Sequence, residues 1–119
     1  MTEQNYLMIY QDSQQEHYFV YILLCADNAY YIGLTNDMVR RLKDHEQGGY
    51  PRCFTFKRRP VRLVYYETIP FLEEAVAREV QLKKWSRKKK EALIQRDYHR
   101  LRQLAQCQNL SHSQYKDLR

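Results

Sequence analysis

The sequence predicts an α+β domain in which helices flank a small three-stranded antiparallel sheet, with the elements in the order ββαβαα. Segments 18–25 and 30–34 are rich in β-branched and aromatic residues, and turn formers separate them. Segment 61–67 is a third β-forming run, and helical patterns precede and follow it. A chain of 119 residues can bury one core but is too short for two ordinary domains. We therefore expect a single domain.

The first two β segments are expected to pair as a hairpin. The residues between them include Asp27 and Asn28, whose side chains favour turns. Gly33 lies within the second apolar run, and a glycine has no side chain to pack in a strand. We therefore expect Gly33 to end or bend the second strand.

A helix should follow the hairpin and end near Gln47. Residues 35–37 are threonine, asparagine and aspartate, which can cap its first turn, and two glycines stop it. The next segment, 48–60, is expected to be a basic loop with one helical turn near 53–57.

The third strand, 61–67, follows a proline, and a helix is expected over 72–85. Ser86 is a good N-cap for a further helix, which either continues past Asp97 or breaks there before it reaches Cys107. These helices must pack on the sheet, because a three-stranded sheet is stable only when its apolar face is covered.

The two ends of the chain differ in composition from the segment between them. Residues 1–17 are acidic and polar with no lysine or arginine, which predicts a flexible acidic leader. Residues 108–119 are polar and predict a frayed tail. The single domain is therefore expected to span residues 18–107.

The composition also indicates in which cellular compartment the protein is found. The cysteines, Cys25, Cys53 and Cys107, are odd in number and lack zinc-site or CxxC spacing, which favours reduced thiols that pack as small hydrophobes. No stretch approaches the roughly 20 apolar residues that span a bilayer, and the N-terminus lacks the layout of a secretory signal. The sequence thus predicts a soluble, cytoplasmic protein with no membrane partner.

Positive charge is concentrated in two stretches of the chain. The formal net charge is +6, with eight basic and two acidic residues between 40 and 62, and nine basic and two acidic residues between 83 and 102. Such clustering is typical of proteins that bind a polyanion, most often nucleic acid. An ordinary solvated basic surface is the competing interpretation.

Glu79 is the most informative acidic residue. On a helical projection it falls in the middle of an apolar stripe. The stripe consists of Leu72, Ala75, Val76 and Leu82. A carboxylate that points toward apolar packing is costly unless it is paired or binds a metal. The competing interpretation is an i,i+4 ion pair with Lys83.

Four other residues could serve phosphate chemistry. Arg41 and His45 are four apart on the predicted first helix, so they leave it in the same direction and can address one ligand. A guanidinium matches two phosphate oxygens, and an imidazole can donate to phosphate or exchange a proton near neutral pH. Tyr21 and Tyr31 lie on the hairpin, and a phenol can act as a base if cations such as Arg41 lower its pKa. Taken singly, each residue is better explained as a surface or packing side chain.

Taken in order, these residues resemble the signature of the GIY-YIG nuclease superfamily. The matching positions are Tyr21, Tyr31-Ile32-Gly33, Arg41, His45 and Glu79. The segments that resemble its small stand-alone bacterial members, related to the nuclease subunit of branched-DNA resolvases, are 18–23, 31–37, 40–42 and 58–65. The resemblance covers roughly residues 18–95, and Phe19 and Val20 stand where the first motif has glycine and isoleucine.

The resemblance implies a GIY-YIG-like sheet flanked by helices and a single divalent metal, Mg²⁺ or Mn²⁺, bound through Glu79. It implies that Tyr21 helps to remove a proton from the attacking water and that Tyr31 positions water or phosphate. Arg41 would stabilise charge on the scissile phosphate, with His45 as a supporting donor or proton-transfer group.

We therefore expect a metal-dependent endonuclease that hydrolyses phosphodiester bonds in DNA rather than RNA, with a preference for branched, flapped or single-stranded structures, in DNA repair or recombination. Basic side chains would hold the phosphate backbone with little reading of sequence. These are Arg40, Lys57, Arg58, Arg59, Lys83, Lys84, Arg87 and Lys88. The alternative is a nucleic-acid-binding module with the same fold and little or no catalysis, acting through a protein partner. The sequence does not predict whether the protein forms a homo-oligomer.

Overall fold

The computed structural model describes residues 8–9 and 17–106 of the chain. The chain forms two compact units, Met1–Lys83 and Lys84–Arg119. Most of the predicted leader and all of the predicted tail lie outside the described residues, so the predicted limits of the domain stay predictions. Within the leader, Ile9 is completely buried and belongs to the core cluster of the first unit. None of the described helices is both long enough and apolar enough to traverse a bilayer.

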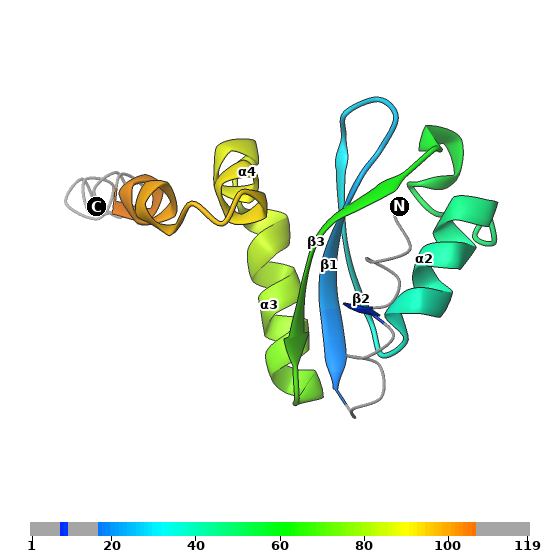
Figure 1. Cartoon of the computed structure of the whole chain (residues 1–119), viewed down its shortest axis with the longest axis horizontal. Helices are drawn as coiled ribbons and strands as arrows, with labels where there is room; N and C mark the ends of the chain where they lie inside the picture. The colour runs from blue at the N-terminus through cyan, green and yellow to red at the C-terminus, as the bar shows by residue number, and fades with distance from the viewer. Residues whose placement is uncertain (1–7, 10–16, 107–119) are drawn as a thin grey trace, which may run out of the picture. The chain divides into compact units, whose positions relative to one another are not determined.

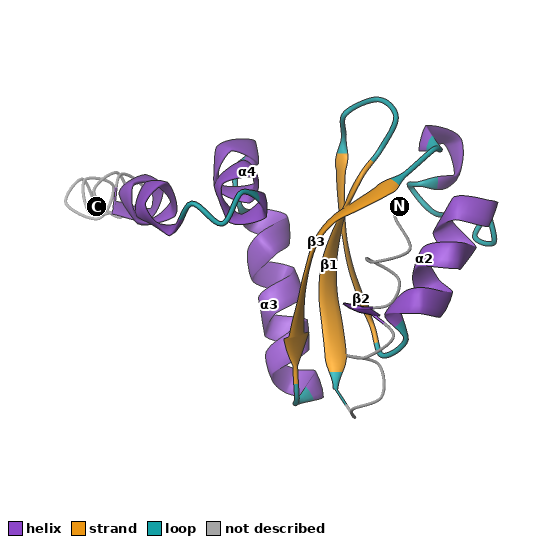
Figure 2. Cartoon of the chain, viewed as in Figure 1, coloured by secondary structure: helices purple, strands orange, loops and turns teal. Residues whose placement is uncertain are grey.

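A three-stranded antiparallel sheet forms the centre of the first unit (Figure 1). Its strands are β1 (Tyr18–Leu24), β2 (Tyr30–Thr35) and β3 (Arg62–Ile69), in the order β2-β1-β3. β1 and β2 form the predicted hairpin, and in the turn between them Asn28 adopts a φ of 68°, a left-handed conformation that asparagine tolerates. The predicted α+β class and element order are confirmed (Figure 2). The strand β3 begins and ends later in the chain than predicted.

The described part of the first unit contains α2 (Met38–Gln47), the 3-10 helix η1 (Phe56–Arg58) and all but the last residue of α3 (Leu72–Lys84). The side chain of Asp37 caps α2 by accepting a hydrogen bond from a backbone N–H of its first turn. Gly48 ends this helix with a φ of 75°, which favours glycine. Both ends of α2 therefore lie where the sequence predicts them, whereas η1 lies slightly later than the predicted helical turn.

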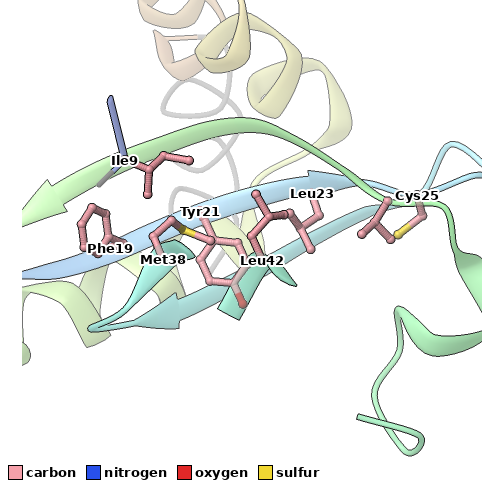
Figure 3. Packing of buried hydrophobic residues seen from close by; sticks show 8 residues of the cluster. Ile9, Phe19, Tyr21, Leu23, Cys25, Met38 and Leu42 are labelled. Atoms are coloured by element: carbon pink, nitrogen blue, oxygen red, sulfur yellow. The ribbon is translucent and has the colours of Figure 1, made fainter. Parts of the chain in front are cut away.

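Alternate residues of β1 point to opposite faces of the sheet. Phe19, Tyr21 and Leu23 point to the face covered by α2, where they pack with Met38 and Leu42 (Figure 3). All five side chains are completely buried. Burial stabilises a fold by about 1.5–3 kcal/mol for each large apolar side chain, so this cluster holds α2 against the sheet.

The helix α3 covers the opposite face of the sheet. Val20 and Ile22 of β1 are fully buried there, and Glu67 of β3 lies directly across from Val20. Because paired residues in antiparallel strands share a face, Glu67 points toward α3 as well. Arg78 of α3 forms an ion pair with Glu67 at 2.6 Å. Figure 1 shows α2 and α3 on the two sides of the sheet.

The predicted apolar stripe of α3 is divided between two faces of the helix. Ala75 and Leu82 are buried, but Leu72 is 49% and Val76 43% exposed. The predicted apolar stripe around Glu79 is therefore buried only in part. A small sheet covers a narrower part of the helix than the apolar residues occupy.

Gly33 neither ends β2 nor breaks its pairing. It lies within the strand and pairs with Tyr21 of β1. A Cβ at this position would be 2.3 Å from the phenol ring of Tyr21. The predicted strand end is therefore wrong, because this glycine leaves room for the Tyr21 ring to lie across the neighbouring strand.

The described part of the second unit is helical. The helix α4 (Arg87–Ile94) begins at Ser86, whose hydroxyl accepts the backbone N–H of the first turn at 3.2 Å. Arg96 has a φ of 57°, and Asp97 caps a further helical segment, 98–106. Of the two predicted alternatives, the helix therefore breaks at Asp97 rather than continuing.

Candidate active site

The phenol of Tyr21 contacts the imidazole of His45 in the interior. Tyr21 comes from β1, and His45 comes from the last turn of α2. The Tyr21 hydroxyl oxygen lies 2.9 Å from His45 Nε2. Tyr21 is 0% and His45 1% exposed, so both side chains are buried, and the prediction that His45 addresses a ligand together with Arg41 stays a prediction. The two residues share a side of α2, but the end that carries His45 packs against the sheet.

Two residues of the basic loop complete the surroundings of His45. His45 Nδ1 lies 2.8 Å from Thr55 Oγ1, and the Thr55 hydroxyl donates to Cys53 Sγ at 3.5 Å. Burial alone would raise the pKa of the Cys53 thiol, but hydrogen bonds from Thr55 and Tyr31 lower it overall. Neither Thr55 nor Cys53 was predicted as a site residue, because a hydroxyl and a thiol in an irregular loop have no periodicity that would single them out.

Aromatic rings pack around the imidazole of His45. The ring centroids of Tyr31 and Tyr50 lie 5.2 and 5.4 Å from that of His45, both in edge-on arrangements. Phe54 stacks on Tyr31 with an interplanar angle of 19°. The guanidinium of Arg41 lies 5.1 Å from the centre of the Tyr50 ring, which places a cation at the rim of the cluster.

An open polar pocket of about 290 Å³ adjoins this aromatic cluster. Its walls come from the β2–α2 turn, from α2 and from the loop that follows. The lining residues are Thr35, Asn36, Asp37, Arg40, Arg41, Asp44 and Tyr50. Arg41 and Tyr50 belong to both the pocket and the cluster, and the Tyr50 hydroxyl donates to Asp44 at 2.9 Å. The guanidinium groups of Arg40 and Arg41 can bind an anionic group such as phosphate, beside the carboxylates of Asp37 and Asp44.

Burial determines the protonation of the clustered groups. It raises the pKa of Tyr21 far above the ordinary value, although the Arg41 guanidinium acts in the opposite direction. Burial raises the pKa of Tyr31 to about 12 and lowers that of His45 to about 4. At neutral pH both phenols are therefore protonated and the imidazole is neutral. The condition that cations lower a tyrosine pKa is not met, because the desolvation of a phenolate outweighs the attraction of Arg41.

Glu79 of α3 is linked to the cluster by electrostatics. Its carboxylate is among the charges that raise the pKa of Tyr31, although burial is the largest cause. Glu79 Oε1 lies 3.6 Å from Lys83 Nζ, so the competing interpretation, an i,i+4 ion pair, is also observed. The glutamate side chain is 20% exposed and remains accessible to a small ion.

Glu79 can bind a divalent metal only if water and substrate supply the remaining ligands. Among the described residues, no group of three or more histidine, cysteine, aspartate or glutamate side chains could hold a metal ion. Mg²⁺ takes oxygen ligands and usually retains several waters, so one carboxylate and a phosphate can suffice. Lys83 is 55% exposed and can leave Glu79 for solvent when a cation binds.

The predicted phosphate-binding residues differ in the contacts that they make with the rest of the protein. Arg58 Nε donates to Asp27 at 3.0 Å, and its guanidinium lies 3.7 Å from the centre of the Phe54 ring. Arg59 Nε donates to the carbonyl of Phe56 at 3.0 Å. Both arginines therefore hold the loop in place. Of the others, Lys83 forms an ion pair with Glu79 and Arg87 forms one with Glu91. All six are exposed, and they are Arg40, Lys57, Lys83, Lys84, Arg87 and Lys88.

The chain is similar to several known proteins. Residues 17–92 match the family model of the GIY-YIG catalytic domain. A UPF0213 protein of Listeria monocytogenes is 46% identical over 84 residues, which cover 69% of this chain and 91% of that protein. A UPF0213 protein of Syntrophus aciditrophicus is 41% identical over 83 residues, or 70% of this chain and 95% of that protein.

A solved structure shares the fold. The solution NMR structure of the protein EF2693 from E. faecalis has a TM-score of 0.51 and 33% sequence identity, and the match covers 71% of this chain and 88% of that one. The family model matches more than half of the chain, and the matched segment contains every residue of the predicted signature. The chain therefore belongs to the GIY-YIG nuclease family, and its relatives are small UPF0213 proteins.

Proposed function

We propose that the protein is a divalent-metal-dependent endonuclease that hydrolyses phosphodiester bonds in DNA. The main support is the convergence of Tyr21, Tyr31, Arg41 and His45, which come from β1, β2 and α2, on one cluster beside a polar pocket. Glu79 lies within electrostatic reach of the same cluster. A nuclease needs a phosphate-binding cation, a proton acceptor and a metal-binding carboxylate, and this set contains all three.

Arg41 is the residue best suited to bind the scissile phosphate. It lines the pocket, and its fork of N–H donors matches two phosphate oxygens. Glu79 would hold Mg²⁺ or Mn²⁺, which when bound polarises the phosphate and favours ionisation of water. Stabilisation of the charge that develops on phosphate is the largest single contribution expected from the protein.

The two tyrosines have different tasks in this proposal. Tyr31 is half-buried at the edge of the cluster and positions water or phosphate. Tyr21 takes part in removing a proton from the attacking water, and His45 supports it through the hydrogen bond between them.

Exposed basic side chains would hold the DNA backbone. We assign this task to Arg40 and Lys57 in the first unit and to Lys84 and Lys88 in the second, since all four are exposed. Contacts to phosphate give salt-sensitive binding with little reading of sequence. A preference for branched, flapped or single-stranded DNA, and a role in repair or recombination in the cytoplasm, complete the proposal.

Cleavage of labelled branched and linear DNA, with and without Mg²⁺ or Mn²⁺, tests this function. Glu79→Gln removes the carboxylate charge, and Arg41→Ala removes the phosphate-binding fork, so each should lower the cleavage rate by roughly 10²–10³-fold. Glu73→Gln, at an exposed position of the same helix, is the matched control and should leave the rate unchanged. Undiminished cleavage by both the Glu79 and the Arg41 variants would defeat the assigned site.

A second candidate function is nucleic-acid binding without cleavage. The observation that favours it is the burial of Tyr21 and His45, which separates the proton-accepting groups from bulk water. This function predicts salt-dependent DNA binding, no strand scission with either metal, and equal affinity of the Glu79→Gln variant and the unchanged protein.

A further inference from the structure

A chain of buried hydrogen bonds runs from the sheet into the basic loop. Tyr21 Oη lies 2.9 Å from His45 Nε2, and His45 Nδ1 lies 2.8 Å from Thr55 Oγ1. The Thr55 hydroxyl continues the chain to Cys53 Sγ at 3.5 Å. Tyr21, His45 and Thr55 are each no more than 1% exposed, so water does not replace these partners. Each of these polar atoms must therefore find its hydrogen-bond partner within this buried series.

The number of protons available fixes which group donates in each of these hydrogen bonds. A neutral imidazole has one N–H and one lone pair, and a threonine hydroxyl has one proton to donate. Thr55 donates that proton to Cys53, so its oxygen accepts from His45, and His45 Nδ1 must hold the hydrogen. His45 Nε2 then presents its lone pair to the hydroxyl of Tyr21.

Cys53 is the acceptor at the end of this series of hydrogen bonds. Tyr31 and Thr55 both act to lower the pKa of the Cys53 thiol, so the sulfur lies near the strand that carries Tyr31. Loss of this acceptor would free the Thr55 hydroxyl to rotate and donate to His45 instead.

We propose that Thr55, oriented by Cys53, is a positioning residue that holds His45 in the Nδ1–H tautomer with Nε2 facing Tyr21. The use of this arrangement in catalysis rests on the proposed nuclease function. As Tyr21 takes a proton from the attacking water, its own O–H bond breaks and that proton passes to His45 Nε2. The imidazole becomes an imidazolium that keeps its bond to Thr55, and Tyr21 remains a neutral phenol, so the interior never holds a phenolate.

Nitrogen NMR of the protein labelled with ¹⁵N-histidine tests the proposal, since the imidazole shifts report which nitrogen is protonated. Thr55→Val keeps the shape and removes the hydroxyl, whereas Thr55→Ser keeps the hydroxyl. We expect the Nδ1–H form in the unchanged protein and in the serine variant, and a mixture of tautomers in the valine variant. Loss of such a supporting partner typically costs 10–100-fold in activity, so DNA cleavage should fall by about that factor in Thr55→Val and recover in Thr55→Ser.

Cys53→Ala provides an independent variant in case Thr55→Val does not fold. It should shift His45 toward the Nε2–H form, because Thr55 loses its acceptor, while Cys53→Ser should not. An Nε2–H form in the unchanged protein, or the same pure Nδ1–H form in both Thr55→Val and Cys53→Ala, would overturn the proposal. A tautomer that changes with Thr55 in a protein that cleaves no DNA would support the positioning role and overturn the nuclease function instead.

Discussion

Single residues set the geometry of the site through close approach of β1 and β2. The ring of Tyr21 lies where a side chain at position 33 would be, and the Tyr21 hydroxyl forms a hydrogen bond with His45. A packed interior has few voids, so the ring cannot move aside without losing that hydrogen bond. Gly33 of the YIG motif therefore has a steric role, since its lack of a side chain lets the phenol of Tyr21 reach the imidazole of His45.

Gly33→Ala should consequently destabilise the fold by about 1–3 kcal/mol, as overpacking of a core does. A Cβ at Gly33 would lie 2.3 Å from the Tyr21 ring, whereas one at Gly49 would lie 3.4 Å from Asp44, an ordinary contact. Urea unfolding of both alanine variants measures the difference. Equal stability of the two variants would mean that the ring of Tyr21 relaxes freely, contrary to this account.

Among the elements, those with local signals were predictable from the sequence and those set by tertiary contacts were not. The hairpin and α2 follow from β-forming runs, a capping aspartate at Asp37 and a left-handed glycine at Gly48. Tyr21 and Arg41 were identifiable through the spacing of the family signature. Thr55 was not, because its position depends on how the basic loop is held against the hairpin.

Arg58 is the side chain that holds this loop. Its Nε bonds Asp27 in the hairpin turn, its Nη1 donates to the carbonyl of Phe54 at 2.9 Å, and its own carbonyl accepts the N–H of Ala26 at 2.9 Å. The loop and the hairpin turn are thus joined by side-chain and backbone bonds. We therefore attribute to Arg58 a structural effect on the site in place of contact with DNA.

Arg58→Ala is expected to raise the rate of amide hydrogen exchange in the loop, at Phe56 and Arg58 in particular, whose N–H groups bond within it. Lys57→Ala removes an exposed neighbouring charge and should leave exchange unchanged. The same two variants separate the roles in DNA binding. Removal of a phosphate contact reduces the magnitude of the slope of log affinity against log salt by about 1, which we expect for Lys57→Ala and not for Arg58→Ala. A smaller salt slope for Arg58→Ala but not for Lys57→Ala would show that Arg58 contacts DNA.

Over the whole molecule, chemistry and charge are distributed between the two units. The first unit contains the aromatic cluster and the polar pocket. In the second unit, the described residues 84–106 include eight basic and two acidic residues. The family match ends at residue 92, so the helical segment 98–106 lies beyond it. We therefore attribute the proposed cleavage chemistry to the first unit and much of the attraction for a polyanion to the second.

The stability of the whole protein should depend on pH through His45. Burial and the neighbouring Arg41 guanidinium lower the pKa of His45 from 6.5 to about 4 in the folded protein. Between these values the unfolded chain binds a proton that the folded protein does not, so the free energy of unfolding falls as the pH drops from about 6.5 to 4. The loss amounts to about 3 kcal/mol when the pH has fallen through this range. Urea unfolding at several pH values should show this slope in the unchanged protein and in His99→Gln, an exposed control. His45→Gln should lose most of the slope, and an equal slope in all three proteins would show that other groups govern acid stability.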